Sequence, residues 1–389
     1  MNSIPIKEVL RKLNQAMSGM TKILLEAAAE SEVEKRAGVG FYERSEGRQD
    51  YRNGYRSRTV QTSLETLEIQ VPRLRGQGFV PSFLERKVRA VSEVEEWVEE
   101  AFLSGMNRSS IIRLMESTTG CRPSDDLLKN VAKKLDRQTK DFRERPLNGD
   151  YQYLYLDAAW AKDIVGVNAT KICIMTAVGI TYSGEKEILG FERTPTENEA
   201  AWSGFLTRLK ERGLDPRRIS LVVSDEHKGL KNALSLEIGD VPHQLCWAQR
   251  MRNVRKSVAA SDRSELIRGL QLVYLAKNIN AAKDAFRRWK AKWSKKYPSV
   301  VASVEEDLGY LLAFYSCASL HWEYLRTSNP VERVFRELRR QQYGCGAFAN
   351  RDACNRTVYR VFSWLNGLWQ GKNIWDIRQR KAKKMALAQ

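Results

Sequence analysis

The chain has 389 residues, a formal net charge of +18 and a sequence pI near 9.6. This length allows two or three domains with packed cores, and the excess of 65 Lys and Arg over 47 Asp and Glu favours a polyanionic partner such as nucleic acid, the alternative being a merely basic soluble enzyme. Six Cys without a CxxC pair and three His exclude the usual zinc-ligand spacings, and no apolar run reaches the roughly 18 residues of a membrane span. We therefore expect a cytoplasmic protein with reduced thiols and no membrane contact.

The first 91 residues are predicted to form a helix followed by a basic arm. Apolar residues recur at helical spacing over residues 3–30, and we assign 1–35 to this segment, a candidate oligomer contact. Residues 36–91 begin with an irregular stretch that we interpret as a loop or extended arm, and residues 59–71 alternate as in a short β-ribbon. Basic side chains of the arm suit DNA phosphate contact, the alternative being a solvated loop: Arg44, Arg48, Arg52, Arg56 and Arg58.

Residues 92–148 are predicted to form a small helical domain. We expect helices from Ser92 to Phe102, from about Ser109 to Ser117, and from Asp125 to about Arg137. Their lengths and tight turns fit a DNA-binding helix-turn-helix, although many small bundles share this pattern. The third helix is basic, through Lys129, Lys133, Lys134 and Arg137. Pro, Asn and Gly residues mark 140–150 as a domain boundary.

From Tyr151 the pattern changes to strands. Three β-rich runs at 153–158, 171–180 and 185–193 predict an antiparallel meander. The elements expected after it are a helix at 197–212, a strand at 219–224, a helix at 227–236, a short strand at 243–246, a helical tract over 248–318, and helices at 329–342 and 350–369. We therefore expect an α/β domain in two parts, 149–258 and 319–389, separated by an α-helical segment at 259–318, with a basic tail at the end.

Three carboxylates are candidates for metal-dependent chemistry. Asp157 ends an apolar strand and Asp225 ends a later strand of the same sheet, and polar groups at such strand ends converge. Glu332 lies near the start of a helix, where Asn329 is a natural cap and Pro330 fits the first turn; an exposed N-terminal Glu is the simpler interpretation of this residue alone. Carboxylate oxygens are what Mg²⁺ binds, and paired ions serve phosphoryl transfer.

Other side chains are expected near the same site. Arg339 lies two helical turns after Glu332 on the same face, where it suits contact with a DNA strand. His227 and Lys228 follow Asp225 at a helix N-terminus, which offers amides to a phosphate, and Trp160 closely follows Asp157. Other indoles are expected to fill packing cores: Trp202, Trp247, Trp322, Trp364 and Trp369.

Seven segments over residues 36–370 resemble the Mutator-related DDE transposases of bacterial insertion sequences. In chain order they are DYRNGYRSRTVQTSLETLEIQVPRLRGQGF, YLYLDAAWAK, KEILGFERTPTENEAAWSGFLTRLKERGL, LVVSDEHKGLKNAL, QLCWAQRMRNV, TSNPVERVFRELRRQ and GAFANRDACNRTVYRVF. The resemblance implies a ribonuclease-H-like catalytic domain with an all-α insertion and a mainly helical N-terminal region that binds terminal inverted repeats.

The resemblance also implies an activity. Asp157, Asp225 and Glu332 would hold two Mg²⁺ ions, for which Mn²⁺ substitutes, during strand cleavage and transfer of the 3′-hydroxyl into target DNA. Two element ends must be brought together, so a homodimer or larger assembly on double-stranded DNA is expected, in a nucleoid-associated bacterial protein.

One position departs from the family pattern. Where Cys-x-x-His is usual after the second Asp, this chain has Cys246 and Gln249, and Gln cannot carry a proton near neutral pH. His243 is a candidate substitute, and the alternative interpretation of Cys246 is a buried small apolar residue. The departure keeps open a catalytically impaired or domesticated DNA-binding protein derived from a transposase. Another ribonuclease-H-like nuclease, such as a resolvase, is disfavoured by the N-terminal region and the long helical tract.

Overall fold

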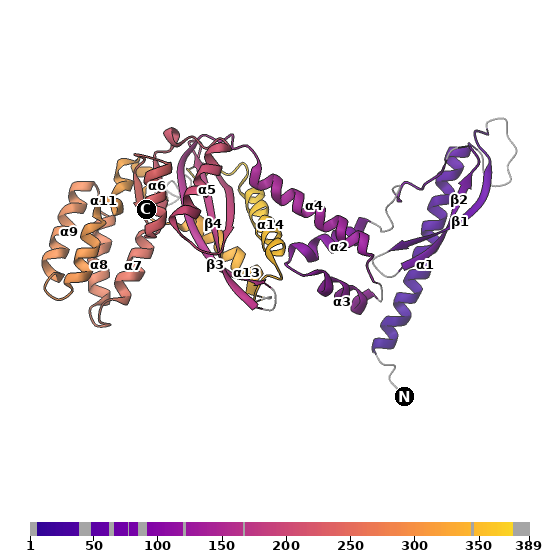
Figure 1. Cartoon of the computed structure of the whole chain (residues 1–389), viewed down its shortest axis with the longest axis horizontal. Helices are drawn as coiled ribbons and strands as arrows, with labels where there is room; N and C mark the ends of the chain where they lie inside the picture. The colour runs from indigo at the N-terminus through magenta and orange to yellow at the C-terminus, as the bar shows by residue number, and fades with distance from the viewer. Residues whose placement is uncertain are drawn as a thin grey trace, which may run out of the picture. The chain divides into compact units, whose positions relative to one another are not determined.

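Figure 1 shows the chain in a computed structural model. The structure describes all residues except 1–5, 39–47, 62–65, 77, 85–91, 120–121, 166–167, 344–345 and 376–389, and it describes their side chains except those of 6–18, 61, 66, 92–93, 119, 165 and 342–343. The chain divides into an N-terminal unit, Met1–Arg137, and a C-terminal unit, Gln138–Gln389. Among the described residues, no helix has the length and apolar character needed to cross a bilayer.

In its described residues, the N-terminal unit combines one long helix, a β-hairpin and three shorter helices. Its elements are α1 (Ile6–Ala37), β1 (Arg52–Gln61), β2 (Thr66–Leu74), α2 (Ser92–Leu103), α3 (Arg108–Thr119) and α4 (Asp125–Glu144), the last of which continues into the C-terminal unit. The helix predicted over 3–30 is confirmed and extends further. Its last turns pack Val33 and Ala37 against Ile69 and Val71 of β2, which buries one face of the hairpin.

The β-hairpin begins earlier than predicted, because β1 pairs with β2 from Arg52 onward. Of the two interpretations given for this stretch, a loop or an extended arm, the loop is therefore wrong for residues 52–58, which form an extended strand. Val60 is the one buried residue among the described side chains of β1, so the strand lacks the apolar alternation by which strands are recognised in a sequence. Arg52 pairs with Glu30 and Glu34 of α1, and Arg56 donates to a backbone carbonyl. Arg58 also lies on β1, Arg48 lies over the Tyr51 ring, and Arg44 lies outside the described residues.

The three predicted helices of residues 92–148 are confirmed as α2, α3 and α4, and they enclose an apolar core that includes Val98, Ile111 and Leu128. The third helix is longer than predicted and runs to Glu144, so the expected boundary segment 140–150 is half helical. Of its four basic candidates, Lys134 binds Glu99 of α2 at 2.7 Å, and the others are exposed: Lys129, Lys133 and Arg137. A DNA-binding role for this bundle stays a prediction.

The C-terminal unit is built on a five-stranded mixed sheet. Its elements up to the sheet's last strand are β3 (Tyr151–Val165), β4 (Asn168–Thr181), β5 (Lys186–Thr194), α5 (Glu199–Glu211), the 3₁₀ turn η1 (Pro216–Arg218), β6 (Leu221–Ser224), α6 (Lys228–Glu237) and β7 (His243–Leu245). The strand order is β5-β4-β3-β6-β7. The predicted antiparallel meander is confirmed, and β6 and β7 run parallel to β3. Therefore β3, β5, β6 and β7 all point toward the same edge of the sheet.

The rest of the unit is helical. It comprises α7 (Trp247–Lys256), α8 (Arg263–Tyr274), α9 (Ile279–Trp293), α10 (Pro298–Glu306), α11 (Leu308–Leu311), the 3₁₀ turns η2 (Ala313–Ser316) and η3 (Ser319–His321), α12 (Trp322–Leu325), α13 (Asn329–Tyr343) and α14 (Arg351–Trp369). Of the five Trp expected in cores, Trp202, Trp247 and Trp369 are buried and Trp322 is partly buried. The prediction was wrong for Trp364, which is 52% exposed on α14.

Both faces of the sheet are covered, because successive strand side chains point to opposite sides. Leu154 and Leu156 of β3 pack with residues of α5 and α6 on one face. Tyr153 and Tyr155 of the same strand pack on the other face, with residues of α7, α13 and α14. Figure 1 shows α5 in front of the sheet, with α13 and α14 beside β3 and β4.

Strand β3 is longer than the predicted run at 153–158. It stays paired with β4 as far as Val165, so Asp157 lies within the strand rather than at its end. Pairing with β6, in contrast, stops at Tyr155 and Val223. The hairpin partner β4 therefore keeps the chain extended where no apolar pattern marks a strand. Asp157 lies just beyond the stretch that β6 covers.

Candidate active site

Asp157 lies on β3, and Asp225 directly follows β6, the neighbouring parallel strand. Tyr155 of β3 is in register with Val223 of β6. Asp157 lies two residues after Tyr155, and Asp225 lies two residues after Val223. Adjacent strands are about 4.8 Å apart, so the two backbones are close neighbours at this edge. By alternation, Asp157 faces the side of the sheet that α13 covers. Across the hairpin it opposes Thr176, whose buried hydroxyl has no hydrogen-bond partner among the described residues.

Glu332 lies in the first turn of α13, and the start of this helix is fixed by the end of β7. The backbone N–H of Ser328 donates to Cys246 Sγ at 3.3 Å, and the Ser328 hydroxyl donates to the same sulfur at 3.4 Å. The Trp247 N–H donates to the Arg326 carbonyl. Since α13 already includes Asn329, Ser328 rather than the predicted Asn329 precedes the first helical residue. Buried Cys246 thus positions the helix that carries Glu332.

The carboxylates are close enough to repel one another. Burial, followed by the charges of Asp225, Glu332 and Glu197, raises the pKa of Asp157 to about 7, although a hydrogen bond from the Ala158 N–H opposes the shift. Burial also raises the pKa of Asp225, opposed by the N–H of His227, which donates to Asp225 Oδ1 at 3.1 Å, and by the His227 imidazole. Such an excess of negative charge in a partly buried site favours a cation.

A fourth carboxylate, Glu197, belongs to this group and was missed in the sequence. It lies between β5 and α5, where its Oε1 accepts from Trp202 Nε1 at 3.2 Å and lies 3.6 Å from His227 Nδ1. Burial raises the pKa of Glu197, the His227 charge lowers it, and Asp225 raises it again. Strand direction was the available signal, because β5 ends at the same edge as β3 and β6.

Close packing of two loops brings Glu197 to Asp225. The loop before α5 meets the turn that opens α6, and Gly229 lies at the contact. A Cβ at Gly229 would lie 2.7 Å from the backbone nitrogen of Glu199 and 3.1 Å from His227 Cε1. A side chain at this position would therefore separate the loops. His227 in turn accepts from the Leu230 N–H at 3.4 Å and caps α6.

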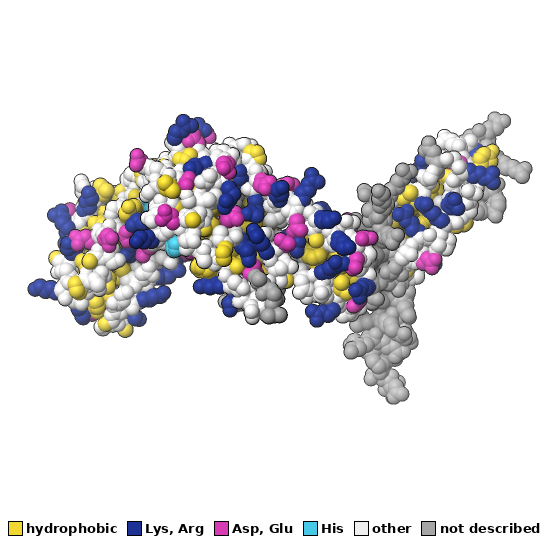
Figure 2. Space-filling view, in the orientation of Figure 1, with side chains coloured by type: hydrophobic (Ala, Val, Ile, Leu, Met, Phe, Trp, Pro, Cys, Tyr) yellow, Lys and Arg dark blue, Asp and Glu magenta, His cyan; other side chains and the backbone are white. Residues whose placement is uncertain are grey.

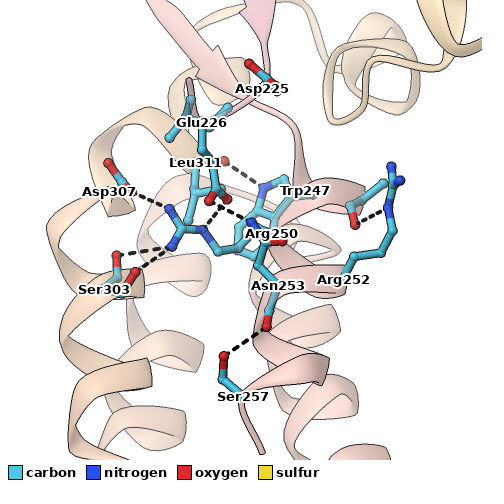
Figure 3. Close-up of polar contacts among 12 residues, drawn as sticks. Asp225, Glu226, Trp247, Arg250, Arg252, Asn253, Ser257, Ser303, Asp307 and Leu311 are labelled. Carbon is cyan, nitrogen blue, oxygen red and sulfur yellow. Dashed lines mark hydrogen bonds and ion pairs between the residues drawn. The ribbon is translucent and has the colours of Figure 1, made fainter. Parts of the chain in front are cut away.

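Arg250 of α7 anchors the residue that follows Asp225. It is 3% exposed, and its Nε forms a salt bridge of 2.7 Å with Glu226 Oε1. Its two terminal nitrogens contact Ser303 of α10, at 2.8 Å, and Asp307. Figure 3 shows the guanidinium enclosed by these three side chains, below Asp225. The loop after β6 is thereby tied to the helical tract, which sequence reasoning did not anticipate.

Arg252, on the same helix, holds Glu332. Its Nη2 donates to Glu332 Oε1 at 2.6 Å, and its side chain points away from the Arg250 cluster in Figure 3. Within the part of the chain that the structure describes, no three His, Cys, Asp or Glu side chains are gathered tightly enough to hold a metal ion. Asp157, Asp225 and Glu332 share one edge of the sheet, and Glu332 is engaged by a cation of the protein itself.

Cys246 and Gln249, which occupy the positions of the Cys-x-x-His motif, have different surroundings. Cys246 is buried, as described, and Gln249 is partly buried in the first turn of α7. His243, proposed as a substitute proton carrier, lies against Ser224 Oγ at 2.7 Å and Tyr310, and burial lowers its pKa to about 4. It therefore stays neutral near pH 7. The imidazole next to the carboxylates is that of His227.

The remaining candidates are spread around the unit. Lys228 is exposed at the start of α6, and Arg339 is exposed on α13, where its Nε donates to the Phe335 carbonyl. Trp160 is exposed on β3. Figure 2 shows Lys and Arg side chains interspersed with Asp and Glu over the visible face of the C-terminal unit. The net positive charge is thus not gathered into one patch on this face.

Comparison with known proteins identifies similar chains. The model of the family described as "Transposase, Mutator family" matches residues 3–371. The transposase for insertion sequence element ISRM5 of Rhizobium meliloti is 29% identical over 100% of this chain and 97% of its own. The transposase for IS406 of Burkholderia multivorans is 31% identical over 91% of each chain, and that for IS905 of Lactococcus lactis is 31% identical over 81% of this chain and 80% of its own.

Proposed function

This chain belongs to the Mutator family of transposases, and from that premise we propose that it cleaves the ends of a bacterial insertion sequence and joins the freed 3′-hydroxyl to target DNA. Asp157, Asp225 and Glu332 are the proposed metal ligands. The observation that supports this most is the register of β3 and β6, which sets the two Asp side by side at the edge where α13 begins. The N-terminal unit would bind the terminal inverted repeats.

The strand order supports a ribonuclease-H-like catalytic domain. An antiparallel meander, β3-β4-β5, is followed by two strands parallel to β3, and the helices α8 to α11 fall between β7 and α13. On this proposal those helices are an insertion in the catalytic domain. Arg250 joins the insertion to the loop after Asp225, and Cys246 joins the end of β7 to the helix of Glu332.

The donor set fits a hard divalent cation, because carboxylate oxygens are the ligands that Mg²⁺ and Mn²⁺ take. Bound as a pair, such ions activate the attacking oxygen and stabilise the leaving oxygen of an in-line displacement. The residues of this chain would then have separate roles in binding the metal ions and the DNA. Asp157 and Asp225 would supply ligands from the sheet, and Glu332 would complete the ligand set once its salt bridge with Arg252 is broken. Arg252, once released, is free to contact a DNA phosphate.

The test incubates purified protein with a labelled element end and Mg²⁺ or Mn²⁺. Asp157→Asn, Asp225→Asn and Glu332→Gln remove one charge each while conserving shape, and Glu337→Gln, on the same helix as Glu332, is the matched control. We expect all four variants to bind the DNA, and only the control to cleave it. Wild-type cleavage by any of the three variants would contradict the assignment. DNA binding without cleavage by the wild-type protein would favour the catalytically impaired alternative.

A further inference from the structure

The β3–β4 hairpin continues beyond the rest of the sheet. Strand β6 reaches only to Tyr155, and the pairing of β4 with β5 ends at Cys173, whereas β3 and β4 stay paired to Val165 and Asn168. Residues 160–165 and 168–172 therefore form a two-stranded projection, visible at the far end of β3 in Figure 1. The projection begins three residues after Asp157.

One face of the projection carries an exposed aromatic ring with two cations. Lys162 and Lys171 are cross-strand partners, and Trp160 lies two residues before Lys162, so all three side chains share a face. Trp160 is 44% exposed, and Lys171 Nζ lies 4.2 Å from the centroid of its ring. The opposite face of the projection is covered, since Ala161 and Asp163 are buried.

The projection is held rigidly. Asp163 forms a salt bridge with Arg193 of β5. The Ile164 N–H donates to the Phe348 carbonyl at 2.9 Å, and the Phe348 N–H donates to the Lys162 carbonyl at 2.8 Å. Phe348 is itself buried and follows the helix that carries Glu332. Trp160 is thus fixed relative to both the sheet and the segment after α13.

We propose that this face of the projection binds an unpaired DNA base next to the cleaved strand end, with Trp160 stacking on the base and the two lysines contacting flanking phosphates. The inference rests on the proposed function. An exposed aromatic ring among cations is the surface that recognises single-stranded nucleic acid without regard to sequence. Three residues of strand span about 10 Å, which about three stacked nucleotides also cover. Asp157 and Trp160 lie on opposite faces of β3, so the DNA strand would pass over the edge of β3 between Tyr155, where pairing with β6 stops, and Lys162, whose carbonyl accepts from the Phe348 N–H.

The experiment measures binding by the full chain without divalent metal, so that no cleavage occurs. One probe is a blunt duplex with the element end, and the second is the same duplex with unpaired 2-aminopurine and thymidine at the 3′ end. Anisotropy gives the affinity, and 2-aminopurine fluorescence reports stacking directly. The variants are Trp160→Ala and Trp160→Phe. Trp364→Ala, which removes an exposed indole from α14 of the same unit, is the control.

We expect Trp160→Ala to bind the overhang duplex about 5- to 100-fold more weakly and to lose the 2-aminopurine quenching, with blunt-duplex affinity unchanged. Trp160→Phe should retain most of both signals, and the control all of them. Equal affinity of wild type and Trp160→Ala for the overhang duplex would overturn the proposal, as would equal losses on both duplexes. Failure of the proposed function is distinguishable, because it would show as absent cleavage in metal while the overhang preference persists.

Discussion

Replacement of Arg250 by Met should strongly destabilise the C-terminal unit. The guanidinium is 3% exposed and faces Glu226 and Asp307, so its removal leaves two partly buried carboxylates without their shared counter-charge. Breaking a buried ion pair in this way costs about 3–5 kcal/mol. Asp307 keeps Lys231, whose Nζ lies 2.9 Å from Oδ1, whereas Glu226 keeps, among the described residues, a hydrogen bond from Asn253 and no other cation. We therefore expect a loss near the lower end, about 3 kcal/mol of unfolding free energy, which is a factor of about 100 in the equilibrium constant.

Urea unfolding followed by tryptophan fluorescence measures this loss, because nine of the ten Trp lie after residue 137 and report on the C-terminal unit. Arg255→Met, an exposed change on the same helix, should shift the free energy by less than about 0.5 kcal/mol. Adding Glu226→Gln to Arg250→Met should recover part of the loss, since the uncompensated charge is then removed. If Arg250→Met unfolds like Arg255→Met, the buried cluster does not hold the loop after Asp225 as described.

Three further predictions concern other contacts of the site. Arg252→Ala should change the free energy of unfolding by less than about 1 kcal/mol, because the Arg252–Glu332 pair is partly exposed. The same change should tighten Mn²⁺ binding in calorimetry, because Glu332 is no longer held by Arg252. Weaker Mn²⁺ binding would count against competition between Arg252 and the metal for Glu332. Gly229→Ala should lower the free energy of unfolding in urea by about 1–3 kcal/mol, because the added Cβ would meet the Glu199 backbone. Gly309→Ala is the control and should not destabilise the protein, because the space around Gly309 is open. Equal effects of the two changes would refute the close contact between the loops. Burial lowers the pKa of His243 from 6.5 to about 4; the charge of Lys231 adds to this shift and that of Asp307 opposes it. Between these two pH values the unfolded chain binds a proton that the folded chain does not. The free energy of unfolding should therefore fall by about 2–3 kcal/mol as the pH drops through this window. His243→Gln should remove this part of the pH dependence, and an unchanged pH profile would contradict it.

The order of helices and strands in the C-terminal unit was predictable, because burial imposes a local apolar period on each element. The meander of β3, β4 and β5 and the helices α5, α6, α13 and α14 all carry that period. Two extended segments lack that apolar period. Strand β1 exposes one face of a two-stranded hairpin, and the end of β3 is kept extended mainly by its backbone pairing with β4, so neither had to be apolar.

The sequence by itself determined which acidic residues to consider, since Asp157 and Asp225 follow apolar runs that any such sheet must bury. Their adjacency depends on the register of β3 with β6, which is a contact between segments more than sixty residues apart. The approach of Glu197, the anchoring of the loop after Asp225 by Arg250 and the pairing of Glu332 with Arg252 likewise join distant segments. Only the tertiary structure decided these contacts, because the partners of a charged side chain leave no local period in the sequence, whereas burial of an apolar face does.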